Sequence, residues 1–277
     1  MKRVTGLLLA GFTASLAGQD VMDSLGEGRP GQGWTLRGGV LGLAVPAYTG
    51  ADETRLAALP VGILDWEGRF VLGPSRVSLG AGAGWRFLAR GSWSGDAGVG
   101  FGERRKEARA DGLAGMGDRD LTFWAGLGGG YRWGAATFRA SFQRALNADG
   151  GTRGALSLGY GWRLGARGFL GASLSATFAD AEHMAYDFGI TPEQAARRAV
   201  LLASGDPRLR PGDARPYAPG GGLRDTSLGL SGGWSLGPRT RFFAFTSLTR
   251  LAETPAQSPL VRAQTTGSLG VGTLYTF

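Results

Sequence analysis

Apolar and polar residues alternate along most of the chain, and the final ten residues, SLGVGTLYTF, show the pattern clearly. One face of this segment carries Leu269, Val271, Tyr275 and Phe277. The other face is small or polar apart from Leu274. A period of two is typical of a strand with one apolar face. A strand that ends on an aromatic residue favours contact with lipid over contact with water, so we expect it to close a membrane barrel.

The same alternation recurs upstream, most clearly from Val77 to Phe87 and from Leu156 to Leu164. Turn residues separate the alternating segments, which is typical of antiparallel strands. The segment around Phe242, Phe243 and Phe245 is ambiguous, because apolar residues fall on both of its faces. About twelve strands are predicted, at residues 33–45, 58–65, 69–73, 76–88, 93–102, 120–133, 135–146, 152–164, 168–180, 224–236, 239–251 and 265–277.

The connections between these strands alternate between short turns and long loops. Bacterial outer-membrane barrels have short periplasmic turns and longer outer loops. The tight turn at 73–75 is the one departure from this rule. The fold class predicted is therefore all-β, an antiparallel transmembrane β-barrel of about 12 strands, with both of its ends in the periplasm.

The tryptophans support this topology, because all but Trp124 fall at predicted periplasmic strand ends. Tryptophan concentrates at membrane interfaces because its ring is amphipathic. A soluble β-sandwich with core tryptophans, the alternative, would not sort them to one end. The phenylalanines Phe101, Phe123, Phe142 and Phe178 fall near the opposite ends and predict a second girdle.

The longest loop, residues 180–223, is expected to contain a short helix. Thr191 fits a helix cap, and Pro192 fits the first helical position. The helix would continue to about Ala203, followed by an irregular segment rich in Pro, Gly and Arg.

The first residues predict export. Residues 1–17 have a positive start, an apolar core and small residues before position 18, as a secretory signal peptide does. Residues 18–32 are polar and predict a periplasmic tail, and residues 33–277 the barrel. The chain contains no cysteine, which excludes disulfides and thiolate metal sites. Basic residues are scattered arginines, which do not indicate nucleic-acid binding. The predicted localisation is the outer membrane.

The chain is poor in clusters of titratable residues that could carry out chemistry. The single histidine, His183, lies in the long loop near Asp180 and Glu182, and a lone loop histidine is expected to be solvated. One histidine with two mobile carboxylates is not a recognised metal site. An outer-membrane hydrolase using His183 is a distant alternative. We expect no enzyme activity, no catalytic residues, no cofactor and no metal.

The predicted inward faces carry more arginines than acids. If the lumen is open, rings of arginine favour anions. If the arginines instead pair with acids such as Asp96 and Asp225, they plug the barrel. Barrel size does not decide between these readings. The candidate lumen residues are Arg76, Arg86, Arg132, Arg139 and Arg163.

Several ordered motifs resemble the MltA-interacting protein (MipA/OmpV) family of outer-membrane proteins. They are PAYTGADE at 46–53 with LP at 59–60, YDFGITPEQA at 186–195, GGLRD at 221–225, SPLV at 258–261 and the terminal aromatic strand. The segment 197–217 is longer and richer in arginine than the family pattern, so a partner contact through this loop does not follow from the resemblance. The resemblance implies an outer-membrane barrel, in some members a scaffold that links a murein hydrolase to a murein synthase.

The functional expectation is therefore a structural or scaffold protein of the cell envelope, organising murein-remodelling enzymes. The alternative is a passive diffusion channel with anion preference. The expected partners are outer-membrane lipids, a murein hydrolase or synthase, and the barrel-assembly machinery. Tyr275 and Phe277 are predicted to act in assembly and closure, because a terminal aromatic resembles the signal read by that machinery.

Overall fold

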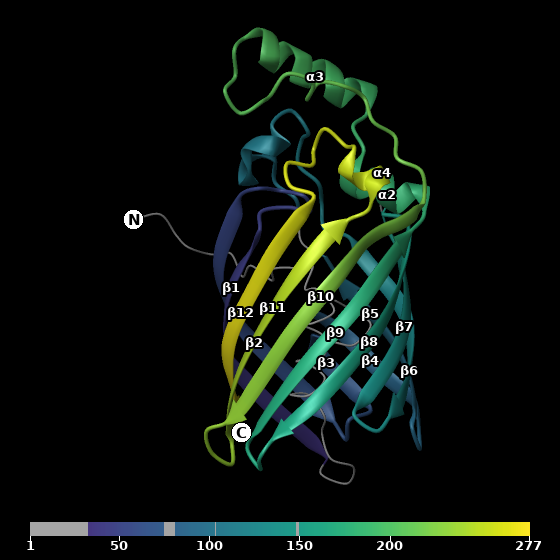
Figure 1. Cartoon of the computed structure of the whole chain (residues 1–277), viewed down its shortest axis with the longest axis vertical. Coiled ribbons are helices and arrows are strands. Elements are labelled where there is room, and N and C mark those ends of the chain that lie inside the picture. Colours follow the sequence, from purple (N-terminus) through teal and green to yellow (C-terminus); the bar gives the residue numbers. More distant parts are fainter. Residues whose placement is uncertain (1–32, 75–80, 103, 148–149) are drawn as a thin grey trace.

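The computed structural model of the protein describes residues 33–74, 81–102, 104–147 and 150–277. Twelve antiparallel strands close into a barrel, each beside its neighbours in sequence, and β1 pairs with β12 at the seam (Figure 1). The predicted architecture is confirmed. The signal peptide and tail predicted at 1–32 and the candidate Arg76 lie outside the described residues. The strands are β1 (Trp34–Pro46), β2 (Thr54–Trp66), β3 (Phe70–Pro74), β4 (Ala81–Arg90), β5 (Trp93–Phe101), β6 (Phe123–Trp133), β7 (Ala136–Ala145), β8 (Thr152–Leu164), β9 (Gly168–Ala179), β10 (Gly222–Ser235), β11 (Thr240–Leu251) and β12 (Thr265–Thr276).

Most predicted strand boundaries agree with the structure to within two or three residues. The largest difference is in β2, which begins at Thr54 and not at residue 58. This extension arises because β1 and β2 stay paired as far as Pro46 and Thr54. The predicted tight turn at 73–75 and the start of the predicted fourth strand fall partly outside the described residues.

The outer wall of the barrel is apolar and carries aromatic residues at both ends. At the end with short turns, seven tryptophans are exposed, which confirms the predicted sorting. At the other end Phe123, Phe142 and Phe178 are exposed, while Trp124 is buried and faces the lumen. We take the short-turn end as periplasmic, as in other bacterial barrels. The tryptophans concerned are Trp34, Trp66, Trp85, Trp93, Trp133, Trp162 and Trp234.

The β2–β3 turn shows how the periplasmic end is built. Glu67 and Gly68 have positive φ angles of 53° and 67°. Two consecutive positive φ values are what a type I′ hairpin requires, and that turn matches the twist of the strands. The carboxylate of Asp65 accepts a hydrogen bond from the backbone N–H of Gly68 at 2.8 Å, which stabilises the turn.

The barrel interior contains an apolar core beside the seam. Its buried members come from the four strands on both sides of the seam. Phe243 is fully buried there and Phe242 faces outward, which resolves the ambiguous eleventh strand. Leu274 is buried in the same core, so the apolar residue that interrupts the inward face of β12 has a packing role. The buried residues are Leu41, Leu43, Ile63, Phe243, Phe245 and Leu274.

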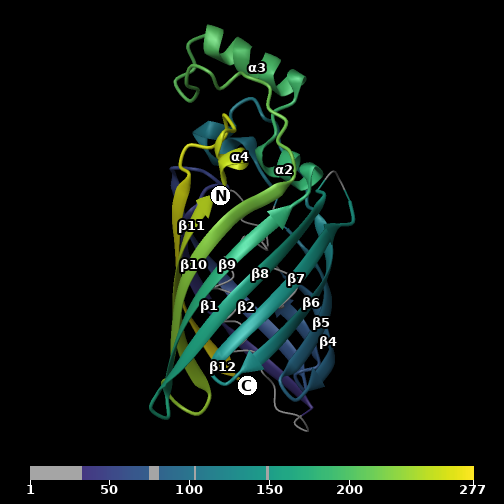
Figure 2. The same ribbon diagram turned by 45° about the vertical axis from the view of Figure 1, so that its right-hand side comes forward.

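The outer loops contain all the described helices and lie over the end opposite to the C-terminus (Figures 1 and 2). The β5–β6 loop carries the 3₁₀ turns η1 (Glu107–Arg109) and η2 (Asp111–Leu113). The β9–β10 loop carries α2 (Ala181–Phe188) and α3 (Pro192–Ala203), and the β11–β12 loop carries α4 (Glu253–Ala256). The helix expected from Thr191 is confirmed as α3, whereas α2 was not predicted.

No helix in the described part of the chain combines the length and apolar character needed to cross a membrane.

Candidate functional site at the outer mouth

The outer loops pack against one another and form a cap over the mouth. We call this cap the described loop residues 47–53, 104–122, 180–221 and 252–264. Met116, Ile190, Ala195 and Leu260 share one buried cluster, although they belong to three different loops. In a ring of twelve sequentially ordered strands, the β5–β6 and β11–β12 loops start from opposite sides. Their joining in one cluster therefore means that the cap extends across the mouth.

Arg198 of α3 lies at the centre of the cap and is completely buried. Its Nε donates to the carbonyl oxygen of Asp213 at 2.7 Å. Its Nη1 donates to the carbonyl oxygens of Gly112 and Ala114 at 3.1 and 2.8 Å. Burial lowers the pKa of Arg198, and the nearby Asp213 carboxylate opposes that shift. One guanidinium thus joins the β5–β6 loop to the β9–β10 loop.

Asp213 continues this connection to the far side of the barrel. Its carboxylate forms a buried ion pair with Arg262 of the β11–β12 loop and lies 3.6 Å from Nη2 of Arg198. The hydroxyl of Tyr48 in the β1–β2 loop donates to the carbonyl oxygen of Leu260 at 2.8 Å. Four loops are therefore tied together by buried polar contacts. Such contacts fix geometry, because each leaves an unsatisfied buried group if it breaks.

A second set of polar groups, the mouth cluster, lies where the cap meets the barrel. It comprises His183, Asp187, Arg153, Arg224 and Asp225. Arg224 donates to Asp187 at 2.7 Å and also pairs with Asp225, its neighbour in β10. Arg153 of β8 lies over the Trp124 ring, with its guanidinium carbon 5.0 Å from the ring centroid. Burial raises the pKa of Asp187, but the charge of Arg224 and its hydrogen bonds outweigh this effect, so that the net shift is downward. The cluster holds ionised groups that compensate one another.

His183 is buried, with 1% of its surface exposed, so the expectation of a solvated loop histidine is wrong. It lies in α2, whose first turn is capped by Asp180, and its Nδ1 is 2.8 Å from the carbonyl oxygen of Gly150. The Trp124 ring meets it edge-on at 5.6 Å between centroids. Burial lowers the pKa of His183 to about 4, although the Asp187 carboxylate acts in the opposite direction. The imidazole is therefore neutral at physiological pH.

The surroundings of the His183 ring bear on the hydrolase alternative. Nε2 of His183 lies 3.5 Å from a carboxylate oxygen of Asp187 and has no hydrogen-bond partner among the described residues. No hydroxyl nucleophile is hydrogen-bonded to the ring in the described part of the chain. Asp180 caps α2 and accepts from the His183 backbone at 2.7 Å, so it does not converge on the imidazole. No cluster of three potential metal ligands occurs within residues 33–74, 81–102, 104–147 and 150–277.

The structure places the four described arginine candidates on the lumen face of the wall. Arg86 of β4 donates through Nε to Asp96 of β5 at 3.2 Å, so this arginine is neutralised by an acid as the plugged alternative requires. Arg132, Arg139 and Arg163 lie on the consecutive strands β6, β7 and β8. Arg132 is opposite Thr137, Arg139 is opposite Gly130 and Ser157, and Arg163 is opposite Phe169 of β9. Because β6, β7 and β8 are neighbours, these three arginines lie on one side of the lumen wall, and we call them the basic stripe.

Tyr275 and Phe277 lie at the periplasmic rim, on the outer face. Their rings meet edge-on at 5.2 Å between centroids. The backbone N–H of Phe277 donates to the carbonyl oxygen of Leu36 at 3.1 Å, which extends the seam to the last residue. The Phe277 ring covers Gly38 of β1, where a Cβ atom would come within 3.2 Å of it. These contacts place both residues at the closure point of the barrel.

Sequence reasoning missed the two arginines that organise the outer end, Arg198 and Arg224. No local signal distinguishes them from the other arginines of the chain, because their burial depends on distant loops. The helix α2 had a detectable signal. Asp180 followed by Ala181-Glu182 is a standard helix start, and Gly189 follows its last residue.

The comparisons with known proteins agree with this architecture. The family model of the MltA-interacting protein MipA matches residues 38–277. None of the curated proteins compared with the chain matches it. Among solved structures, the chain is similar to an outer-membrane channel of Pseudomonas putida F1, at 10% identity and a TM-score of 0.42, with 91% of this chain and 100% of that chain covered. It is also similar to a loop-deletion mutant of OmpT, an outer-membrane protein of Vibrio cholerae, at 10% identity and a TM-score of 0.39, with 88% and 99% covered.

At 10% identity and TM-scores below 0.5, these similarities do not indicate a function. The location follows from the closed barrel, its apolar outer wall and its aromatic girdles, which are features of bacterial outer-membrane proteins. The family match extends over most of the chain. The chain is an outer-membrane β-barrel, and it belongs to the MltA-interacting protein MipA family.

Proposed function

We propose that the protein is a structural scaffold of the outer membrane that organises murein-remodelling enzymes at its periplasmic face. The observation that carries the proposal is the cap, because loops from opposite sides of the barrel meet over the outer mouth. A barrel closed in this way is poorly suited to bulk diffusion. The family description, an MltA-interacting protein, supports a partner that acts on murein.

The chain contains no cysteine, so a single introduced cysteine can carry a crosslinker at a chosen position on the face that would contact the partner. A single cysteine at Ala166, in the exposed β8–β9 turn, would place a photo-crosslinker at the periplasmic rim. A matched cysteine at Ala203, exposed at the end of α3, would place the same reagent on the cap. We expect a lytic transglycosylase and a murein synthase to be crosslinked from Ala166 and not from Ala203. Failure to recover either enzyme, by crosslinking or by co-purification in mild detergent, would count against the scaffold.

A second function, an anion-preferring diffusion channel, has one observation in its favour. Arg132, Arg139 and Arg163 form the basic stripe on the lumen wall, and arginine-lined pores favour anions. Planar-bilayer recordings distinguish the two functions. A scaffold with a closed cap gives no conductance steps, whereas regular steps with anion selectivity would favour the channel.

A further inference from the structure

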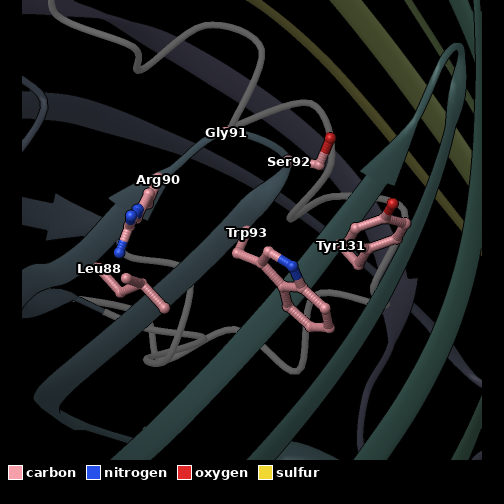
Figure 3. A pocket seen from close by; sticks show the side chains of 6 residues that line it. All are labelled: Leu88, Arg90, Gly91, Ser92, Trp93 and Tyr131. Carbon is pink, nitrogen blue, oxygen red and sulfur yellow. The ribbon is translucent and has the colours of Figure 1, made fainter.

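An open groove of about 480 Å³ lies at the periplasmic rim of the barrel, where β4, β5 and β6 end. It is lined by the side chains of Leu88, Arg90, Trp93 and Tyr131 and by the turn residues Gly91 and Ser92. Figure 3 shows Arg90 on one side of Trp93 and Tyr131 on the other. The groove belongs neither to the cap nor to the lumen.

A β-bulge directs Arg90 to the outer face. Arg86 pairs with the inward Asp96, but the next paired position is Leu88 opposite Gly95, so that Phe87 is an extra residue. Such a bulge reverses the inward or outward direction of the residues that follow it. Without the bulge Arg90 would share the lumen face of Arg86. With it, Arg90 lies opposite Trp93, whose side chain is 60% exposed on the outer wall.

The groove combines a charge with an interfacial aromatic pair. Trp93 and Tyr131 pack against each other with centroids 4.7 Å apart. Such residues lie at the level of lipid headgroups. Arg90 is exposed, and within the described residues its guanidinium makes no ion pair. A guanidinium presents a planar set of donors that matches a phosphate oxygen pair.

The wall beside the groove is suited to an acyl chain. Leu88 lies in the groove, and Val99 of β5 and Leu127 of β6 continue the outward face away from the rim, with 51% and 58% of their surfaces exposed. A ligand with an anionic phosphate at one end and a hydrocarbon chain at the other fits both parts of this surface.

We infer that this groove is a binding site for one anionic phospholipid of the periplasmic leaflet, with its phosphate on Arg90, its headgroup against Trp93 and Tyr131, and its acyl chain along Leu88 and Val99. This site is independent of the proposed scaffold function. A zwitterionic lipid fits less well, because its cationic group would lie close to the guanidinium.

The test is native mass spectrometry of the delipidated full-length barrel in detergent, titrated with phosphatidylglycerol. We expect one lipid to bind at the lowest concentrations, and Arg90→Gln to weaken that binding about tenfold or more, as loss of a charge-assisted contact does. The matched control is Arg167→Gln, which removes the same charge from an exposed periplasmic turn that is not part of the groove. Heat-dependent migration on a detergent gel would verify that each variant is folded.

Two further probes define the ligand. Phosphatidylcholine should bind about tenfold more weakly than phosphatidylglycerol. Millimolar inorganic phosphate should not displace the lipid. Equal binding of phosphatidylglycerol by wild type and Arg90→Gln would overturn the proposal, as would an equal loss in Arg167→Gln. Displacement by phosphate would overturn it in favour of a site for free anions.

Discussion

The two ends of the barrel are built in different ways. The periplasmic end consists of short turns and a ring of exposed tryptophans, so its apolar surface is matched to the membrane. The outer end folds on itself, with a buried arginine, a buried histidine and clusters of apolar residues. The periplasmic end is therefore stabilised by contact between its exposed aromatic residues and lipid. The cap is stabilised by buried polar and apolar contacts, as a small soluble domain is.

The largest effect is expected at Arg198. Replacing it with methionine, Arg198→Met, removes the buried guanidinium and leaves the carbonyl groups of Gly112, Ala114 and Asp213 without their donor. Breaking a buried ion pair from one side costs about 3–5 kcal/mol. We expect hydrogen exchange in the cap to accelerate while the strands stay protected. Arg208→Met, at a local surface pair with Asp206, is the control and should change exchange by less than about 1 kcal/mol. Equal protection in both variants would mean that the cap does not depend on Arg198.

The second effect is a pH dependence of the cap through His183. Its pKa is about 4 in the folded cap and ordinarily 6.5, so the unfolded cap binds the proton first as the pH falls. Stability is therefore complete above pH 6.5 and decreases between 6.5 and 4, by roughly 3 kcal/mol. The lowered pKa of Asp187 adds a further loss only below about pH 4, its ordinary range.

Hydrogen exchange or proteolysis of the cap as a function of pH would measure this slope. His183→Gln keeps a polar side chain that does not titrate, so it should remove the slope between pH 4 and 6.5. A slope that persists in His183→Gln would assign the acid sensitivity to another group.

A smaller effect is expected at the start of α3. Thr191 caps the helix, and the side chain of Gln194 bonds back to the Thr191 backbone at 2.9 Å, which is a complete capping box. Thr191→Ala should destabilise the outer part of the cap by about 1 kcal/mol. Exchange at the backbone amides of residues 193–195 would report the change. Thr191→Asp supplies another good cap residue and should retain wild-type protection.

The smallest effect on the folded molecule is expected at the periplasmic rim. Phe277 is 71% exposed, and its ring lies against Tyr275 and Gly38. Phe277→Ser should change the unfolding free energy in detergent by about 1 kcal/mol or less, as an exposed site does. If Phe277 is an assembly residue, the amount of barrel in the outer membrane should nevertheless fall severalfold. Phe242→Ser, at a non-terminal outward aromatic, is the matched control. Equal membrane levels of the two variants would remove the assembly role.

The wall of the barrel was largely predictable because apolar residues that face lipid alternate along each strand with small or polar residues that face the lumen. The positions of Trp93, Trp133 and Trp162 at strand ends predicted the periplasmic girdle. The bulge at Phe87 and Leu88 was not predictable. Both residues are apolar, so the sequence does not indicate that one of them is an extra, unpaired residue. Its consequence, the outward position of Arg90, was therefore also hidden.

The cap was far less predictable, because its contacts join distant parts of the chain. Local signals located α3 through Thr191 and Pro192, but nothing near Arg198 indicates that Gly112 and Ala114 surround it. His183 was expected in solvent for the same reason: its burial depends on Gly150 and Trp124, which belong to other loops and strands. Alternation alone puts the candidate arginines of β4 and β6 to β8 on the inner face, and it also puts Asp96 there, the acid that pairs with Arg86.

The seam between β1 and β12 has a kinetic consequence. Every other strand pairs with its neighbour in sequence, while Arg37 must find Thr276 across nearly the whole described chain. Contacts of such long range are slow to form, because the chain loses loop-closure entropy before the strand pairing can compensate for that loss. Until this last pairing, two strands with free backbone groups remain open to wrong partners, including the edges of other unfinished barrels. The stage before this last pairing is therefore the one at which wrong pairing competes most with closure of the barrel.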